Sequence, residues 1–327
     1  MKIAYTICSA NYLPYAKSMA DSLIQHNPEY QVIIGLADTY NNYNPAFFQP
    51  HKIVPVTGMQ ISVLDDMNAR YEIFELCCAL KPFVAEFIFK TYESCDTLLY
   101  FDSDILLYSN LSLAEFELQR HSILLTPHVS IPLPAKISVE AELDVLRTGL
   151  YNAGFFGLRR TETSLGFLEW WKERLVKYSF NDAAHGLFVD QLWLDLVPLY
   201  FKDTSILFDP GYNLAYWNFN ERVIEKKDGG YFVNGNQPLV FFHFSGHDIE
   251  QPDKISKHQR AHCFEKSPHL QPLFDNYIKT VIANNTTDYL SLPCTLGTTQ
   301  SLKHTLPTEK KSSIKLSLKK LFSGLVS

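Results

Sequence analysis

The chain has 327 residues, of which 46% are hydrophobic and 20% are charged, and its formal net charge is −6. This composition suits a globular protein with enough apolar material for a large core. The negative charge argues against a nucleic-acid binder, which should carry a basic footprint. No apolar run reaches the roughly 18 residues of a membrane span, and the N-terminus lacks the features of a signal peptide. We therefore expect a cytoplasmic protein.

The first hundred residues alternate between apolar strand patterns and helical periodicity. Pro14 falls in the first turn of the first expected helix, where proline is tolerated, and Pro82 should interrupt or kink the second. The order predicts β-α-β units and a largely parallel sheet. The expected elements are strands at 3–8, 30–37, 52–57 and 97–101, and helices at 11–27 and 70–93.

The rest of the chain continues this α/β alternation after a proline-rich stretch at 127–137 that we expect to be a loop. We expect strands at 122–126, 154–158, 205–208 and 239–244, and helices at 162–178, 186–197 and 270–284. The six cysteines form no C-x-x-C pair, which indicates free thiols in a reducing compartment.

Two carboxylates, Asp102 and Asp104, interrupt the apolar run at 98–108. Burying a charge there is expensive unless it is paired or bound to a metal. On an extended chain residues i and i+2 share a face, so both could bind one hard cation such as Mg²⁺ or Mn²⁺. They also follow a strand, and ligands of open α/β sheets bind at the carboxyl ends of strands. A β-turn that uses aspartate for local hydrogen bonds is the alternative.

Three later segments place polar residues beside apolar ones. Asn152 begins Asn-Ala-Gly, whose small residues allow close backbone approach to a ligand. Asp190 and Gln191 precede an apolar stretch and could contact a sugar or a reacting hydroxyl, or serve only as a helix N-terminus. His243 ends a strand just before the turn at Gly246 and could be a third ligand to the ion, although a lone strand histidine is commonly a core residue.

The order and spacing of these four motifs resemble the retaining glycosyltransferases of family eight, which have the GT-A fold and include glycogenin and bacterial lipopolysaccharide galactosyl- and glucosyltransferases. The resemblance runs from about Lys2 to about Gly246. It implies a mixed, mostly parallel sheet flanked by helices. It also implies Mn²⁺ (or Mg²⁺) as cofactor and transfer of a hexose from a nucleotide sugar, UDP-linked in this family, to a glycan or lipid-linked acceptor.

The resemblance implies a role for each matching residue. Asp102, Asp104 and His243 would bind the metal, with Ser103 between the carboxylates and Gly246 closing the turn. Asp190 and Gln191 would be the catalytic pair. The donor would contact Lys81 (where the family usually has arginine), the sugar-pocket residues Asn152, Ala153 and Gly154, and the base-and-ribose residues Thr6, Cys8, Ser9, Ala10 and Asn11.

One family position differs. A lysine that meets the diphosphate commonly lies three residues after the glycine, where this chain has Ile249. Lys254, Lys257 or His247 could replace it from a longer loop. Two other classes stay open: a sugar nucleotidyltransferase, although 9–14 lacks a glycine-rich basic loop, and an inactive glycan-binding relative.

We expect three parts in the chain: a GT-A catalytic domain at 1–265, a C-terminal helical extension at 266–302 and a basic amphipathic tail at 303–327. The tail has six lysines and a single acidic residue, interleaved with leucines. This pattern is typical of a segment that binds an anionic membrane surface. A disordered, solubilising tail is the alternative. Membrane binding would suit bacterial surface polysaccharide assembly at the cytoplasmic face.

Overall fold

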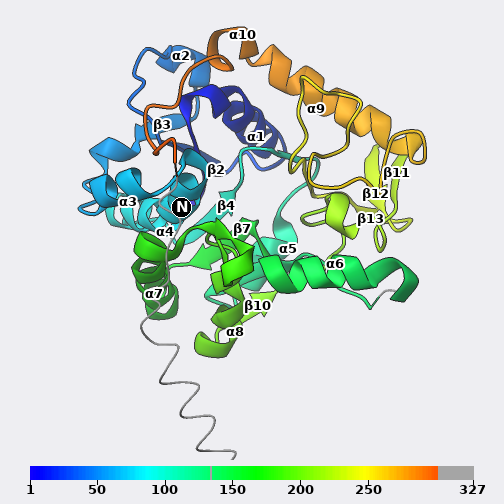
Figure 1. Cartoon of the computed structure of the whole chain (residues 1–327), viewed down its shortest axis with the longest axis horizontal. Helices are drawn as coiled ribbons and strands as arrows, with labels where there is room; N and C mark the ends of the chain where they lie inside the picture. Colours follow the sequence, from blue (N-terminus) through cyan, green and yellow to red (C-terminus); the bar gives the residue numbers. More distant parts are fainter. Residues whose placement is uncertain (133–134, 301–327) are drawn as a thin grey trace, which may run out of the picture.

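A seven-stranded mixed sheet forms the centre of the computed structural model, which describes residues 1–132 and 135–300 (Figure 1). Neighbouring strands are parallel, except that β7 is antiparallel to both β4 and β6. The expected mixed, mostly parallel sheet is confirmed. In spatial order the strands are β10 (Thr204–Ile206), β6 (Ile123–Pro127), β7 (Tyr151–Arg159), β4 (Thr97–Phe101), β1 (Lys2–Cys8), β2 (Tyr30–Leu36) and β3 (Lys52–Pro55).

Helices cover both faces of this sheet, because side chains that alternate along each strand build a separate core on either side. Tyr100 lies in one core and its neighbour Phe101 in the other. The first core packs against α4 (Ile73–Thr91) and α7 (Glu162–Tyr178), and the second against α1 (Leu13–His26) and α5 (Ser112–Leu118).

Shorter elements fill the periphery. The remaining helices before residue 265 are α2 (Pro45–Phe48), α3 (Leu64–Arg70), α6 (Ala135–Thr148) and α8 (Val197–Tyr200). Three small sheets pair β5 (Ile105–Leu107) with β14 (Phe241–His243), β8 (Asn181–Asp182) with β9 (Leu187–Phe188), and β11 (Ile224–Lys227) with β12 (Gly230–Val233) and β13 (Gln237–Pro238).

The structure differs from three expectations about local structure, in whole or in part. Helix α4 runs without interruption through Pro82. The stretch expected as loop at 127–137 gives way to helix α6, which continues to Thr148. Residues 186–197 form no single helix but a short strand, a turn and a 3₁₀ segment (Leu192–Leu196). Gly186 (φ 77°) and Val189 (φ 40°) adopt left-handed conformations that a right-handed helix excludes.

The segment after residue 265 folds back onto the sheet rather than away from it. Helix α9 (Gln271–Ala283) packs on α1, and the Asn284 amide donates a hydrogen bond to Ser18 Oγ (2.9 Å). After α10 (Thr286–Tyr289) the chain reaches α3 and the start of α4: Gly297 N donates to Asn68 Oδ1 on α3 (2.7 Å) and Gly297 lies against Ile73. The boundary at 265 stays a prediction, and the tail at 303–327 lies outside the described residues. Within residues 1–132 and 135–300, no helix combines the length and hydrophobicity that a membrane crossing requires.

Candidate metal and nucleotide-sugar site

Asp102, Asp104 and His243 converge at the end of β4. His243 pairs with Ile105 across β14 and β5, and its Nε2 lies 3.1 Å from an Asp104 oxygen and 3.8 Å from an Asp102 oxygen. One potential ligand atom from each residue lies within 4.8 Å of the others. Two carboxylates and an imidazole suit a divalent ion such as Mn²⁺ or Mg²⁺, so the donor set fits the expected cofactor.

The two carboxylates meet by a different route from the one that the sequence pattern suggests. They do not lie on an extended strand, because residues 102–104 form a tight turn in which Ile105 N donates to Asp102 O (3.3 Å). The turn is attached to the sheet, since Asp102 N donates to Gly154 O on β7 (2.8 Å). Both Asp102 and Asp104 therefore face the end of β14.

The surroundings of Asp102 divide the roles of its two oxygens. Oδ1 accepts a hydrogen bond from the Tyr100 hydroxyl (2.6 Å) and lies 3.4 Å from Lys81 Nζ. Oδ2 is the oxygen that faces His243. One oxygen is thus held by the scaffold and the other is directed toward the position that a cation would occupy.

Electrostatics couple His243 to Asp104. Burial alone would raise the pKa of the Asp104 carboxyl, but the charge of His243 and its hydrogen bond bring that pKa below its usual value. Burial would lower the pKa of His243, and Asp104 followed by Asp102 reverses that effect and raises it. The positive charge of protonated His243 and the negative charge of Asp104 stabilise each other. A bound cation would take the place of the proton on His243.

Gly154 is required for the position of His243. A Cβ at Gly154 would lie 2.4 Å from His243 Cε1 and 2.7 Å from Asn152 Oδ1, far inside contact distance. The glycine of the Asn-Ala-Gly segment therefore makes room for a protein side chain, the imidazole of His243. Approach of a ligand to this segment, which the small residues predicted, stays a prediction.

Lys81 lies behind the carboxylates and is almost fully buried. Its Nζ is 2.8 Å from Asp190 Oδ2 and donates to Ala153 O (3.0 Å). Burial lowers the pKa of Lys81, but Asp102 and Asp190 outweigh it and raise that pKa, so the side chain is a fixed cation. Burial in turn raises the pKa of Asp190 despite the lysine. Lys81 is therefore ion-paired with Asp102 and Asp190.

The catalytic pair expected at 190–191 is placed by an unusual backbone. Val189 has φ 40°, a strained conformation for a β-branched residue, and Trp171 Nε1 donates to Asp190 O (3.2 Å). Gln191 Oε1 accepts hydrogen bonds from Asn152 Nδ2 (3.0 Å) and Ala153 N (3.1 Å). Gln191 thus joins the Asn-Ala-Gly segment to the Asp190 turn.

A second buried polar network extends from Asn152. Asn213, which also has a left-handed φ of 53°, donates to Asn152 Oδ1 (3.1 Å). His128 Nε2 lies 3.2 Å from Asn152 Nδ2, and burial lowers the pKa of His128 to about 4. The Trp217 ring contacts both His128 and His243 edge-on, with centroids 5.2 Å apart in each case. In the sequence, the stretch 211–218 resembles a Tyr-Asn motif of the family-eight enzymes, and nothing marks His128.

The residues expected to bind base and ribose lie at the end of β1 and in the turn after it. Thr6 and Cys8 are buried strand residues, while Ser9 donates to Asn11 Oδ1 (2.6 Å). Ala10 N donates to the buried Asp38 (3.3 Å), which the sequence did not single out. Asp38 also accepts a hydrogen bond from Thr295 of the C-terminal segment.

The loop after His243 does not bring every expected residue to the site. Gly246 has φ 69° and closes the turn. Lys254 is exposed and its Nζ donates to Gln251 Oε1 (2.7 Å), while Ile249 is partly buried against an apolar cluster that includes Phe242, Phe244 and Phe274. His247 is buried against Phe274 and Tyr277.

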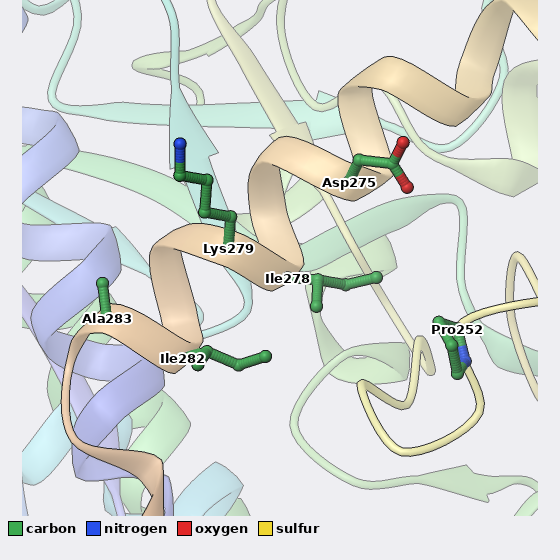
Figure 2. Close-up of a pocket in the computed structure, with 6 residues that line it drawn as sticks. All are labelled: Pro252, Asp275, Ile278, Lys279, Ile282 and Ala283. Carbon is green, nitrogen blue, oxygen red and sulfur yellow. The ribbon is translucent and has the colours of Figure 1, made fainter.

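A separate apolar groove lies on the outer face of α9 (Figure 2). None of the residues that line it belongs to the metal triad or its neighbours, so we do not count it as part of this site. Its lining residues are Pro252, Asp275, Ile278, Lys279, Ile282 and Ala283.

Comparison with known proteins supports the fold assignment. No family model matches the chain. Bacillus subtilis (strain 168) YfnF is 26% identical over 260 residues, which cover 79% of this chain and 86% of YfnF. An active-site mutant of LgtC superposes with a TM-score of 0.51 and 15% identity over 86% of this chain and 96% of the LgtC chain. The galactosyltransferase LgtC in complex with donor and acceptor sugar analogues gives a TM-score of 0.47 and 15% identity over 90% of this chain and 98% of its own. The chain has the GT-A fold.

Proposed function

We propose that this protein is a metal-dependent glycosyltransferase that moves a hexose from a nucleotide sugar to a glycan or glycolipid acceptor. The observation that carries the proposal is the convergence of Asp102, Asp104 and His243 at the carboxyl end of β4, where α/β sheets bind their ligands. The GT-A fold shared with LgtC supports it.

Each polar group of the site has a role in such a reaction. Asp102, Asp104 and His243 would hold Mn²⁺ or Mg²⁺, which supplies Lewis-acid stabilisation of a departing diphosphate. Asp190, paired with Lys81 at 2.8 Å, would orient a sugar or acceptor hydroxyl, and Asn152 and Gln191 would complete the sugar pocket. The reacting carbon would develop oxocarbenium character.

We further propose that the donor is a UDP-hexose and that the anomeric configuration is retained. The amide of Gln191 is a poor nucleophile and is engaged by Asn152 and Ala153. Same-face attack assisted by the departing phosphate is therefore a better route than double displacement. Proton NMR of the product's anomeric linkage tests this proposal, and an inverted product contradicts it.

A donor screen tests the function itself. The full chain is incubated with UDP- and GDP-sugars, Mn²⁺ and a panel of glycan acceptors, and nucleotide release is measured with and without EDTA. We expect metal-dependent release from a UDP-hexose. Pyrophosphate release from a nucleoside triphosphate and a sugar phosphate would instead indicate a nucleotidyltransferase. Binding of nucleotide sugars in titration calorimetry without turnover would indicate an inactive relative.

The proposed setting is surface polysaccharide assembly at the cytoplasmic face of a bacterial membrane. It depends on the basic tail at 303–327, where six lysines alternate with leucines. Sedimentation with vesicles that contain anionic lipid, for the full chain and for a variant lacking 303–327, tests this setting. Equal binding by the two proteins contradicts it.

A further inference from the structure

The charge of the site is unbalanced for a diphosphate. The site holds three carboxylates: Asp102 and Asp190 lie against the buried ammonium group of Lys81, and Asp104 lies 3.1 Å from His243 Nε2. A divalent ion would offset this excess, but the diphosphate of a donor brings several further negative charges. A further hydrogen-bond donor on the open side of the metal position would stabilise it.

The loop that follows His243 returns one such group to the site. The His258 ring lies against Gly246, since a Cβ on that glycine would be 2.3 Å from His258 Cδ2 and 2.8 Å from Nε2. Two hydrogen bonds of the loop backbone stabilise this conformation: Lys257 N donates to Gly246 O (2.9 Å), and His258 N donates to Ser256 Oγ (3.2 Å).

His258, which lies against Gly246 of the turn after His243, is also open to a ligand. Burial lowers the pKa of His258 most, and the charge of Lys257 lowers it further. The charge of Asp104 raises this pKa and that of His243 lowers it. The residue is nevertheless exposed, and its side chain has no hydrogen-bond partner among those found for the described residues. Its ring lies 6.3 Å from that of Tyr216, centroid to centroid.

Other basic groups near the loop are less suited to this role. Lys81 is 3% exposed and paired with two aspartates. His247 Nδ1 donates to Lys254 O (2.8 Å), and the ring packs against Phe274 and Tyr277. Lys254 is directed to Gln251.

We infer that His258 donates a hydrogen bond to the diphosphate of the nucleotide-sugar donor. This inference rests on the proposed function. Gly246 is then needed for two reasons: its left-handed φ closes the turn after His243, and its missing side chain lets the imidazole approach. His258 would supply the contact to the diphosphate that Ile249, partly buried against the apolar cluster, does not provide.

Calorimetry with Mn²⁺ tests the inference on the full chain and on His258→Ala, His258→Gln and the remote, exposed His269→Ala. The probes are UDP, GDP and the matching nucleosides. For the diphosphate that the wild type binds, we expect His258→Ala to lose roughly ten-fold or more in affinity. We expect His258→Gln, which retains a donor, to lose less, and His269→Ala to match the wild type. Nucleoside affinity should be unchanged in every variant.

Titration of Mn²⁺ alone, followed by the EPR signal of the free ion, separates a phosphate contact from a metal ligand. We expect His258→Ala to bind Mn²⁺ as the wild type does. The inference is overturned if this variant loses Mn²⁺, if it binds the diphosphate normally, or if Lys254→Ala or Lys257→Ala shows the loss in its place. If the wild type binds neither UDP nor GDP, the proposed function itself fails.

Discussion

The site joins two regions that are built in different ways. The metal side consists of Asp102, Asp104 and His243, which lie at the ends of regular strands next to Gly154 on β7. The sugar side consists of Asn152, Asp190 and Gln191 with the network partners His128 and Asn213. Two of its supporting residues, Val189 and Asn213, have left-handed backbones.

The two regions position their side chains in different ways. On the metal side, strand pairing places each group, so a single well-placed glycine decides whether the ligands meet. On the sugar side, buried hydrogen bonds hold irregular backbone in place, such as the two that Gln191 Oε1 accepts. Substitutions on the metal side should therefore affect activity more than stability, and those in the buried network should do the reverse.

The largest effect is expected at a metal ligand. Asp104→Ala removes a carboxylate that is partly exposed, so the fold should persist while metal-dependent transfer falls at least about a hundred-fold. Activity assays with Mn²⁺ and circular-dichroism melts check both parts. Asp65→Ala, at an exposed position on α3, is the control. Full activity of Asp104→Ala, or of the wild type in excess EDTA, would contradict the metal assignment.

A methyl group added at Gly154 should disrupt the metal site almost as much as the loss of a ligand does. Gly154→Ala places its Cβ 2.4 Å from His243 Cε1, so the imidazole must move and Mn²⁺ affinity should fall about ten- to hundred-fold. Gly166→Ala in helix α7 is the matched control, because the nearest atom to its Cβ is 4.0 Å away and alanine favours the helix. Unchanged Mn²⁺ affinity in Gly154→Ala would show that His243 is no ligand.

The same contrast explains what the sequence could predict. The central strands, α1, α7 and α9 follow from apolar periodicity, and the metal side follows from carboxylates and a histidine at the ends of strands. The predicted arrangement of the two carboxylates is partly wrong, because Asp102 and Asp104 meet through a turn and not on one face of an extended chain.

The sugar side resisted prediction for physical reasons. Helix α6 follows prolines that indicate a loop, and the helix expected at 186–197 does not begin until Leu192, because Gly186 (φ 77°) and Val189 (φ 40°) are left-handed. His128, Asn213 and Trp217 acquire their roles only through contacts between distant segments. His258 lies beyond the motif that ends at Gly246, and it contacts that glycine only because the loop turns back.

Lys81 connects the two regions and should affect stability strongly. Lys81→Met leaves the buried Asp190 without its partner at 2.8 Å, and we expect a loss of about 3–5 kcal/mol in the free energy of unfolding. Lys81→Met combined with Asp190→Leu removes both charges and should recover much of the loss. Urea denaturation of both variants provides the comparison. Equal destabilisation in the two would show that the ion pair is not what holds these regions together.

The smallest expected effect is the pH dependence that His128 gives to the sugar side. Its folded-state pKa is lowered to about 4 by burial, whereas an unfolded histidine titrates near 6.5. The unfolded chain therefore binds the proton more readily, so this contribution is complete above about pH 6.5 and is lost as the pH falls toward 4. We expect His128→Asn to lose roughly 3 kcal/mol less stability than the wild type between pH 7 and pH 4. Urea denaturation at both pH values measures this difference, and parallel losses in the two proteins would indicate that His128 is not held neutral. The metal side should not share this behaviour, because burial and charge raise the pKa of His243 instead.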